Sequence, residues 1–352
     1  MNLQKMKFSI CLLFAVVSAI SALPDQENTV REIANKWIDA INNDPKSTWK
    51  AGHNFHPDTP MSYLQGLLGV SELESNLADL DKYEEMEENE ENKKIKVPKY
   101  FDARKKWKKC KSLREIRDQG NCGSCWAVSV AAAFADRLCI ASNAKWNGHI
   151  SSRELMSCCS YCGFGCEGGF PDAAWVFIKR HGLVTGGDYH SHDGCQPYPI
   201  APCEHHMEGS KPNCSASPTE PTPACETTCT HGSSLAYQKD RQKGKSAYLV
   251  PVGEKQTQLE IFKNGPIVAA FKVYEDFFMY KSGVYKRHPE SPFRGRHAVK
   301  VIGWGEQNGL PYWLVQNSWD YDWGDKGLFK IARGNECDFE KSMTAGLPKY
   351  KK

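Results

Sequence analysis

The chain has 352 residues, carries a net charge of +3 and is 40% hydrophobic. This composition supplies enough apolar side chains for a packed core and excludes a disordered or collagen-like chain. The length is sufficient for one large domain or two of ordinary size. The basic residues are not gathered together with aromatic ones, so we expect no nucleic-acid binding.

The only long apolar run lies at the N-terminus, over residues 8–22, and is too short to span a bilayer comfortably. Lys5 and Lys7 precede the run, and small residues occupy its end. This pattern is typical of a secretory signal peptide, which we place at residues 1–22. We therefore expect no membrane span. We also expect a protein of the secretory pathway, lysosomal or extracellular, that passes through an oxidising compartment.

Charge divides the chain into an acidic first part and a basic remainder. Residues 1–96 hold 10 basic and 16 acidic side chains, a net charge of −6, and residues 97–352 hold 35 and 26, a net charge of +9. The run of glutamates over 84–91 is typical of a solvated linker. We interpret residues 23–96 as a pro-segment that covers a basic body over residues 97–352.

The body is predicted to be helical first and then β. Apolar residues at helical spacing predict an amphipathic helix over 27–41, and the Pro-free, Gly-free segment 125–141 predicts a buried helix. Residues 186–234 are dense in Gly, Pro, Ser and Cys, which predicts a long excursion without regular structure. Short apolar runs after residue 245 predict strands of an antiparallel sheet or barrel, at 267–271, 297–304 and 311–316.

Fifteen cysteines constrain the fold further. Cys11 leaves with the signal peptide, and the other fourteen lie at or after Cys110. Disulfides are favoured in a secreted chain, although a zinc site is an alternative for four closely spaced cysteines, Cys158, Cys159, Cys162 and Cys166. If one cysteine stays reduced, a second is unpaired as well, and spacing alone cannot choose the partners of the remaining twelve.

Cys125 is a candidate nucleophile because it begins the predicted helix 125–141. The free N–H groups and the positive dipole end of a helix N-terminus favour the thiolate, which is the reactive form. Residues 122–126 read CGSCW, with Gln119 shortly before them, and resemble the nucleophile signature of the papain family of cysteine proteases. Further segments that match this family follow in order: 297–298 (HA), 303–305 (GWG), 317–319 (NSW) and 323–324 (WG).

The resemblance implies an α+β, papain-like fold with a helical left lobe, an antiparallel, β-barrel-like right lobe and a cleft between them. It implies that Cys125 attacks the scissile carbonyl and that His297 is the ion-pair partner that protonates the leaving amine. Asn317 would orient the imidazole, and Trp319 would shield their contact and line the substrate site on the leaving-group side. Gln119 would donate to the oxyanion together with the Cys125 backbone N–H.

The excess length before His297 resembles the occluding loop of cathepsin B. His297 lies 172 residues after Cys125 (297 − 125), more than the ~130–150 typical of papain-like enzymes. The loop, at about 195–229, would place His205 and His206 on the C-terminal carboxylate of the substrate, giving peptidyl-dipeptidase as well as endopeptidase activity. Adjacent histidines are otherwise more often idle or metal ligands. Two latches are implied: His205 with Asp118, and Lys211 with Asp322.

The same resemblance implies the substrate-binding residues. Gly168 and Gly169 would hold the substrate backbone, and the pocket for the second residue upstream of the cut would consist of Phe170, Pro171, Ala270, Ala298 and Ser342. Ser342 replaces a glutamate typical of cathepsin B, so we expect apolar or aromatic residues to be preferred over Arg. Arg296 replaces a glycine, and we expect its charge to act on the catalytic pair and to attract acidic residues downstream of the cut.

The resemblance also implies covalent links and partners. Residues 49–55 (WKAGHNF) are similar to the family's inhibitory pro-region, whose acidic excess predicts processing near 93–97 on acidification. Peptide and protein substrates are implied, cystatin-like inhibitors are allowed, and no metal, no cofactor and a monomer are expected. The implied disulfides leave Cys125 and Cys337 free and join Cys110–Cys139, Cys122–Cys166, Cys158–Cys225, Cys159–Cys162, Cys195–Cys229 and Cys203–Cys214.

Two other functions stay open on the sequence. A secreted binding protein on a protease scaffold would keep the fold without activity, although such proteins usually lose the catalytic Cys or His. A Cys/His metal module would need the cysteines to be reduced.

Overall fold

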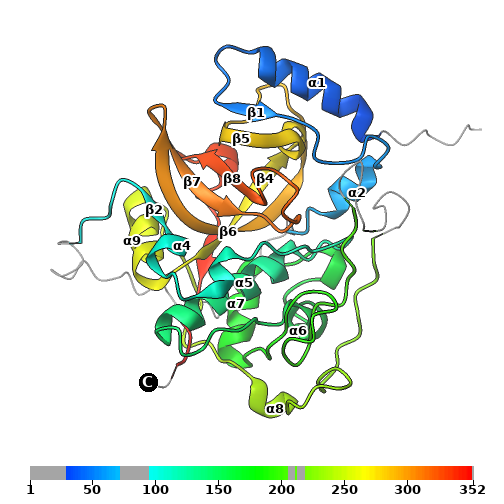
Figure 1. Ribbon diagram of the computed structural model, residues 1–352, viewed down its shortest axis with the longest axis vertical. Coiled ribbons are helices and arrows are strands. Elements are labelled where there is room, and N and C mark those ends of the chain that lie inside the picture. Colours follow the sequence, from blue (N-terminus) through cyan, green and yellow to red (C-terminus); the bar gives the residue numbers. More distant parts are fainter. Residues whose placement is uncertain (1–28, 72–94, 205–210, 212–218, 351–352) are drawn as a thin grey trace, which may run out of the picture.

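The computed structural model describes residues 29–71, 95–204, 211 and 219–350. Figure 1 shows a part dominated by the β-sheet above a part dominated by helices, with α5 at the boundary between them. The predicted signal peptide, the glutamate run, His205, His206 and Cys214 lie outside the described residues. None of the described helices is both long and apolar enough to cross a membrane.

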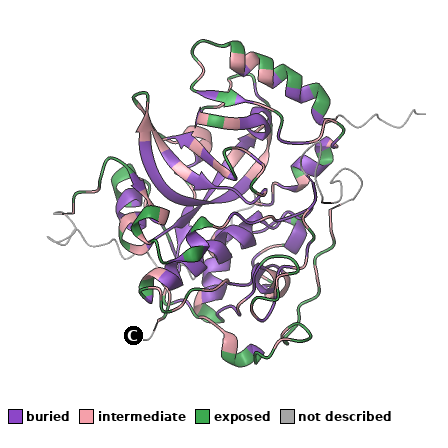
Figure 2. Cartoon of the chain, viewed as in Figure 1, coloured by how far each residue is buried: buried purple, intermediate pink, exposed green. Residues whose placement is uncertain are grey.

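The helix α5 (Cys125–Ala141) is the centre of the molecule and confirms the predicted buried helix. Every residue over 125–139 is buried, which explains why the segment shows no amphipathic pattern. The helices α6 (Ser152–Cys158) and α7 (Pro171–Arg180) contact α5 in the helical part, and strands β4 and β6 contact it from the sheet (Figure 2).

The sheet contains the predicted strands, each extended at one or both ends: β4 (Ile267–Tyr274), β6 (Phe293–Gln307) and β7 (Leu310–Gln316). Its strand order is β1-β5-β8-β7-β6-β4-β9-β3, and β2 also pairs with β6. The order does not close on itself, and β5 pairs with β8 in parallel, so the sheet is open and mixed rather than a closed antiparallel barrel. The other strands are β1 (Trp49–Ala51), β2 (Phe101–Asp102), β3 (Tyr248–Leu249), β5 (Tyr280–Tyr285), β8 (Leu328–Ala332) and β9 (Met343–Ala345).

Two buried ion pairs fix α5 to the sheet part. The Asp136 carboxylate lies 2.8 Å from the Lys300 Nζ on β6, and Arg137 lies 2.8 Å from Glu260 on α9 (Glu254–Asn264). Burial raises the pKa of Asp136, although the ammonium of Lys300 acts in the opposite direction. Removing one partner of such a pair would leave an uncompensated buried charge, so these contacts hold the two parts in one relative position.

The described part of the pro-segment, residues 29–71, is called the N-terminal segment below. Its helix α1 (Val30–Asn43) confirms the predicted amphipathic helix and ends before Asp44, as expected from the following proline. Its strand β1 extends the sheet by pairing antiparallel with β5, and its helix α2 (Met61–Gly66) leads toward the boundary between the two parts (Figure 1). Trp37 of α1 is fully buried and donates from Nε1 to Glu275 at 2.8 Å.

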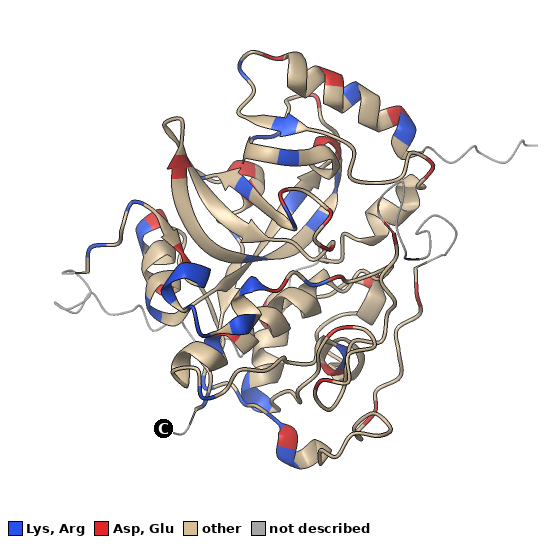
Figure 3. Cartoon of the chain, in the orientation of Figure 1, with Lys and Arg blue, Asp and Glu red and all other residues tan. Residues whose placement is uncertain are grey.

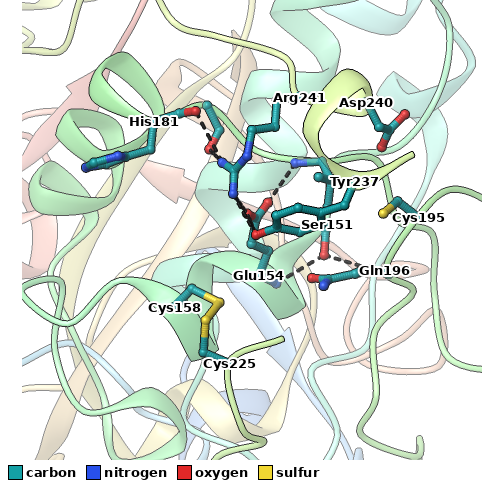
Figure 4. Close-up of polar contacts among 12 residues, drawn as sticks. Ser151, Glu154, Cys158, His181, Cys195, Gln196, Cys225, Tyr237, Asp240 and Arg241 are labelled. Carbon is teal, nitrogen blue, oxygen red and sulfur yellow. Dashed lines mark hydrogen bonds and ion pairs between the residues drawn. A yellow bond between two sulfur atoms is a disulfide. The ribbon is translucent and has the colours of Figure 1, made fainter. Parts of the chain in front are cut away.

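The predicted excursion over 186–234 contains no helix or strand in its described residues. A buried cluster fixes its base to α6, as Figure 4 shows. Glu154 accepts hydrogen bonds from Tyr237 Oη at 2.5 Å and from Arg241, and Ser151 donates to the backbone carbonyl of Gln196 at 2.7 Å. The other short helices in the described part of the chain are α4 (Ala103–Lys106), α8 (Tyr237–Asp240) and four 3-10 turns, η1 (Lys111–Arg114), η2 (Gly165–Glu167), η4 (Glu275–Met279) and η5 (Glu336–Asp338).

Five disulfides join the pairs that the resemblance implies: Cys110–Cys139, Cys122–Cys166, Cys158–Cys225, Cys159–Cys162 and Cys195–Cys229. Cys203 is also disulfide-bonded, and its implied partner Cys214 lies outside the described residues. Cys125 and Cys337 are free thiols. The four closely spaced cysteines are therefore oxidised, which contradicts the zinc alternative.

Figure 3 shows basic and acidic residues distributed over both parts of the molecule.

His149 links the start of the excursion to the segment before α5, and we predict that this link depends on pH. The ring lies 2.5 Å from Glu115 and also contacts Asp193, and the hydrogen bond to Glu115 raises the pKa of His149 despite its partial burial. Because the folded-state pKa is raised, the stabilisation is complete below ~6.5, the ordinary histidine pKa, and is lost as pH rises through the folded-state value.

We expect His149→Gln to lower the melting temperature at pH 5.5 and to have a smaller effect at pH 8.5, measured by thermal unfolding of the full chain. His231→Gln, which changes an exposed histidine, is the matched control and should have little effect at either pH. If the loss of melting temperature in His149→Gln grows as pH rises, the charged form of His149 does not stabilise this link.

Candidate active site

Cys125 lies at the first turn of α5, against the edge of β6. The backbone N–H of Ala298 points at its Sγ, with 3.4 Å between the two atoms. Ser124 occupies the N-cap position, but its hydroxyl pairs with Tyr198 Oη at 2.7 Å and does not cap the helix. No side chain of the described residues therefore caps the start of α5, and the backbone N–H groups of Cys125 and Trp126 act to lower the pKa of the Cys125 thiol.

His297 and Asn317 come together because β6 and β7 are hydrogen-bonded neighbours and Asn317 directly follows β7. Asn317 Oδ1 lies 2.7 Å from His297 Nε2. The other ring nitrogen, Nδ1, is buried and has no hydrogen-bond acceptor among the described residues. Trp319 covers the imidazole with 4.7 Å between ring centroids, and Phe55 of the N-terminal segment lies edge-on to Trp319.

Gln119 presents its amide N–H groups to two carbonyl oxygens. Its Nε2 donates to Cys122 at 2.8 Å and to Leu67 of the N-terminal segment at 3.0 Å. Ser318 Oγ donates to Gln119 Oε1 at 2.7 Å, which sets the orientation of the amide. No such role was predicted for Ser318, although the residue lies inside the matched segment 317–319.

The N-terminal segment follows the cleft as an extended chain. Gly169 donates to the Gly69 carbonyl at 3.0 Å and accepts from the Ser71 N–H at 3.1 Å, while the Val70 N–H donates to the Arg296 carbonyl at 3.2 Å. A Cβ at Gly69 would lie 1.7 Å from the backbone oxygen of Gly123, so only glycine fits at this approach. Gly169 therefore binds an extended backbone, as predicted for a substrate. Gly168 turns the chain beside it with φ of 105°.

Burial decides the charge states of the candidate catalytic pair, since Cys125 and His297 are both 0% exposed. It raises the pKa of the Cys125 thiol to about 11, although the Ala298 N–H acts in the opposite direction. It lowers the pKa of His297 to about 4, although Asn317 favours the charged ring. With the N-terminal segment in place, the pair is therefore a neutral thiol and a neutral imidazole at intermediate pH.

The residues of the predicted upstream pocket lie on two sides of the cleft. Ala270 and Ala298 are opposite one another in β4 and β6, and Ala270 donates to the Ser342 carbonyl at 2.9 Å. Phe170 contacts the apolar cluster that contains Ala298, and the buried Pro171 begins α7.

The side chain of Arg296 reaches into this pocket. Its Nη2 lies 3.3 Å from Ser342 Oγ. The expectation that it would attract residues downstream of the cut is therefore wrong. The side chain of Arg296 lies on the opposite face of β6 from His297, because neighbouring residues of a strand alternate.

The described part of the predicted occluding loop is anchored beside the cleft. Tyr198 Oη donates to the Gln119 carbonyl at 2.8 Å, and Lys211 forms an ion pair with Asp320. The predicted latch between Lys211 and Asp322 is therefore wrong, because Lys211 pairs with Asp320 instead. Lysine carries one point charge on a shorter side chain than the arginine usual in the family, so it pairs with a different carboxylate of the same turn. His205 and His206 lie outside the described residues.

Asn54 fixes the N-terminal segment to the body close to the cleft. Its Nδ2 donates to the carbonyl oxygens of Phe278 at 2.8 Å and Tyr280 at 2.7 Å, and its Oδ1 accepts from the Gly324 N–H at 3.1 Å. Asn54 is fully buried, and so are Phe278 and Tyr280, so these two carbonyls would lose their hydrogen bonds without access to water if the side chain were shortened.

The described residues include no group of three or more His, Cys, Asp or Glu side chains able to hold a metal ion. The chemistry that the site offers from its own side chains is that of a thiol beside an imidazole, with an amide donor directed at a carbonyl oxygen.

Comparison with known proteins finds similar sequences along most of the chain. The family described as papain family cysteine protease matches residues 97–347, and the family described as peptidase family C1 propeptide matches residues 34–74. Cathepsin B-like cysteine proteinase 2 of Haemonchus contortus is 50% identical over 225 residues, 63% of this chain and 65% of that protein. Cathepsin B-like cysteine proteinase 5 of Caenorhabditis elegans is 50% identical over 229 residues, 63% and 66%. The chain spans just under two thirds of the length of these curated relatives.

Solved structures of procathepsins are also similar to this chain. Procathepsin B S9 from Trypanosoma congolense superposes with a TM-score of 0.75 and 37% identity, over 91% of this chain and 98% of that one. Digestive procathepsin L 3 of the Tenebrio molitor larval midgut gives a TM-score of 0.64 at 21% identity, over 90% of each chain, and shares the fold.

We expect the Cys125 thiol to react slowly with iodoacetamide until the N-terminal segment is released. A thiol with a pKa of about 11 is only ~1 part in 10⁴ thiolate at pH 7, and the thiolate is the reacting form. Release of the segment should raise the rate by at least ~100-fold. Mass spectrometry of the Cys125 peptide in a Cys337→Ser background measures this rate, and equal rates before and after release would contradict the prediction.

We expect Asn54→Ala to loosen the N-terminal segment and to raise the alkylation rate of Cys125 in the uncleaved chain. The two buried carbonyls of Phe278 and Tyr280 would be left unsatisfied, each at a cost of ~1–3 kcal/mol, so the rate should rise by at least ~10-fold through more frequent opening. The exposed neighbour His53→Ala is the matched control and should leave the rate unchanged. An Asn54→Ala rate equal to that of the control would show that this residue does not hold the segment.

Proposed function

Given that the chain belongs to the papain family of cysteine proteases, we propose that it is a cathepsin B-type peptidase made as a zymogen. The observation that carries the proposal is the arrangement at the start of α5. There, Cys125 lies against β6 beside the His297–Asn317 pair, and the Gln119 amide already holds a backbone carbonyl oxygen, that of Leu67. This is the set of groups needed to attack an amide bond through a covalent intermediate.

The proposed reaction gives each group a defined role, and His297 acts in both of its steps. The Cys125 thiolate attacks the scissile carbonyl carbon, and the resulting oxyanion accepts from the Gln119 side chain and the Cys125 backbone N–H. His297 gives its proton to the leaving amine as the acyl-enzyme forms, and then takes a proton from the water that hydrolyses it. Asn317 keeps the imidazole in its orientation through the 2.7 Å contact with Nε2. Trp319 excludes water from that contact.

The N-terminal segment acts as the inhibitor of this site in the proposal. It fills the extended-chain site at Gly169, and its Leu67 carbonyl occupies the donor position of Gln119. By burying the pair it also keeps Cys125 and His297 uncharged. We propose residues 1–22 as signal peptide, 23–96 as pro-segment and 97–352 as mature enzyme, with acid-triggered processing near 93–97.

The loop over 195–229 supports the proposed exopeptidase activity. The Cys195–Cys229 disulfide closes its base, and Tyr198 and Lys211 attach it beside the cleft. In the proposal His205 and His206 bind the C-terminal carboxylate of the substrate and set the cut two residues from its end.

The proposal extends to location and partners. The enzyme acts in the secretory pathway, in the lysosome or outside the cell. Its partners are peptide and protein substrates, its own pro-segment and cystatin-like inhibitors, and it works as a monomer.

We expect the acid-activated protein, at about pH 5, to remove C-terminal dipeptides in sequence from a peptide with a free C-terminal carboxylate. Mass spectrometry of the products, with Cys125→Ser as the inactive control, measures this. Internal cuts alone would keep the catalytic pair but remove the role of the histidine loop. No cleavage by a sample that has lost its pro-segment would favour a binding protein on a protease scaffold.

A further inference from the structure

The upstream pocket contains a cation that the general mechanism does not use. In β6, Arg296 and Ala298 are two residues apart, so their side chains lie on one face of the strand. On the same face of β4 lie Ala270, opposite Ala298, and Lys272, opposite Arg296. The Arg296 guanidinium ends at Ser342, whose hydroxyl accepts from its Nη2 at 3.3 Å. The charge therefore lies among residues of the upstream pocket.

This guanidinium has only a neutral partner. Among the described residues, Arg296 forms no ion pair, and its Nε is buried without a hydrogen-bond acceptor. A guanidinium has five donors arranged to match both oxygens of a carboxylate, and Ser342 accepts from one of them. Arg296 therefore still has N–H donors available for a negatively charged group.

The surroundings of Arg296 carry an excess of positive charge. Asp338 is the nearby acidic side chain, and its two oxygens are already taken by Lys272 and Lys341, each at 2.8 Å. Lys272 and Lys341 share the single negative charge of Asp338, and Lys272 is also close enough to Arg296 to be affected by its charge. These four residues together carry a formal charge of +2. A carboxylate that enters the pocket would be attracted by this positive charge. Asp338 would not compete with it for Arg296, because both oxygens of Asp338 already bind lysines.

The N-terminal segment covers this site with an apolar residue. Val70 pairs with Gly169 on one side, and its N–H donates to the Arg296 carbonyl on the other at 3.2 Å. Val70 offers no acceptor to the guanidinium through its side chain. Release of the segment would leave Arg296 and Ser342 open to the substrate residue that takes this position.

We propose that Arg296, positioned by Ser342, makes the upstream pocket a carboxylate site that selects aspartate or glutamate at the second residue before the cut. This inference rests on the proposed function and names its substrate class. It goes beyond the expectation from Ser342 alone, which favours apolar residues over Arg, because the same geometry that disfavours a basic side chain provides an ionic partner for an acidic one.

The test compares two peptides that differ only in Glu or Gln at this position, at pH 5.5, where glutamate is ionised. We expect kcat/KM for the Glu peptide to exceed that for the Gln peptide by ~10-fold or more, the size typical of a charge-assisted hydrogen bond. Arg296→Gln should bring the ratio near one. Taking the ratio on one enzyme cancels any effect of the substitution on the neighbouring catalytic pair.

A second variant keeps the arginine. Ser342→Glu provides an internal carboxylate for Arg296 and should also abolish the Glu preference, whereas Lys255→Gln, the same charge change on an exposed turn of α9, should leave the ratio unchanged. Cleavage of both peptides at equal rates by the unmodified enzyme, or a Glu preference that persists in Arg296→Gln, would overturn this inference and leave the peptidase intact. Failure to cleave either peptide or an unrelated denatured protein would overturn the proposed function and this inference with it.

Discussion

The structure depends on one helix that is buried on every side and begins at its reactive residue. Residues 125–139 of α5 are all buried, and the ion pairs of Asp136 with Lys300 and of Arg137 with Glu260 hold the helix against the sheet part. The start of α5 is therefore placed rigidly beside β6. Cys125 lies beside β6, with its Sγ 3.4 Å from the backbone nitrogen of Ala298, the residue after His297. This approach follows because a helix end and a strand from different parts of the molecule are fixed at one boundary.

The N-terminal segment occupies the site by contacting the groups that the proposed function assigns to a substrate. Its Leu67 carbonyl accepts from Gln119, its backbone pairs with Gly169, and the close passage of Gly69 over Gly123 leaves no room for a side chain. The segment also adds a strand to the sheet and fixes Asn54 in three hydrogen bonds. The segment therefore acts in two ways. It fills the site, and by burying Cys125 and His297 it favours the neutral forms of both side chains.

The sequence allowed accurate prediction wherever the signal was local. The helix 125–141 was found because fifteen of its residues are buried and need apolar or small side chains, and the runs at 297–304 and 311–316 were found because the centres of β6 and β7 are buried. Cys125, His297, Asn317 and Gln119 were found through motifs that resemble a known family. The predicted antiparallel sheet is interrupted by one parallel pairing, that of β5 with β8, which depends on contacts between distant residues that no local pattern records.

By itself, the sequence predicted a chain of helices followed by strands, with oxidised cysteines, an N-terminal pro-segment and a candidate nucleophile at a helix start. The first features depend on composition and periodicity, and the two-part α+β fold depends on motifs that resemble a known family. Only the tertiary structure decided which groups face one another. Lys211 pairs with Asp320 rather than Asp322, Ser318 orients Gln119, and Arg296 points at Ser342 rather than along the cleft toward the leaving side. The physical reason is that side-chain direction follows from strand alternation and from pairing across β4, β6 and the chain before β9. These relations exist only when residues far apart in sequence are brought together.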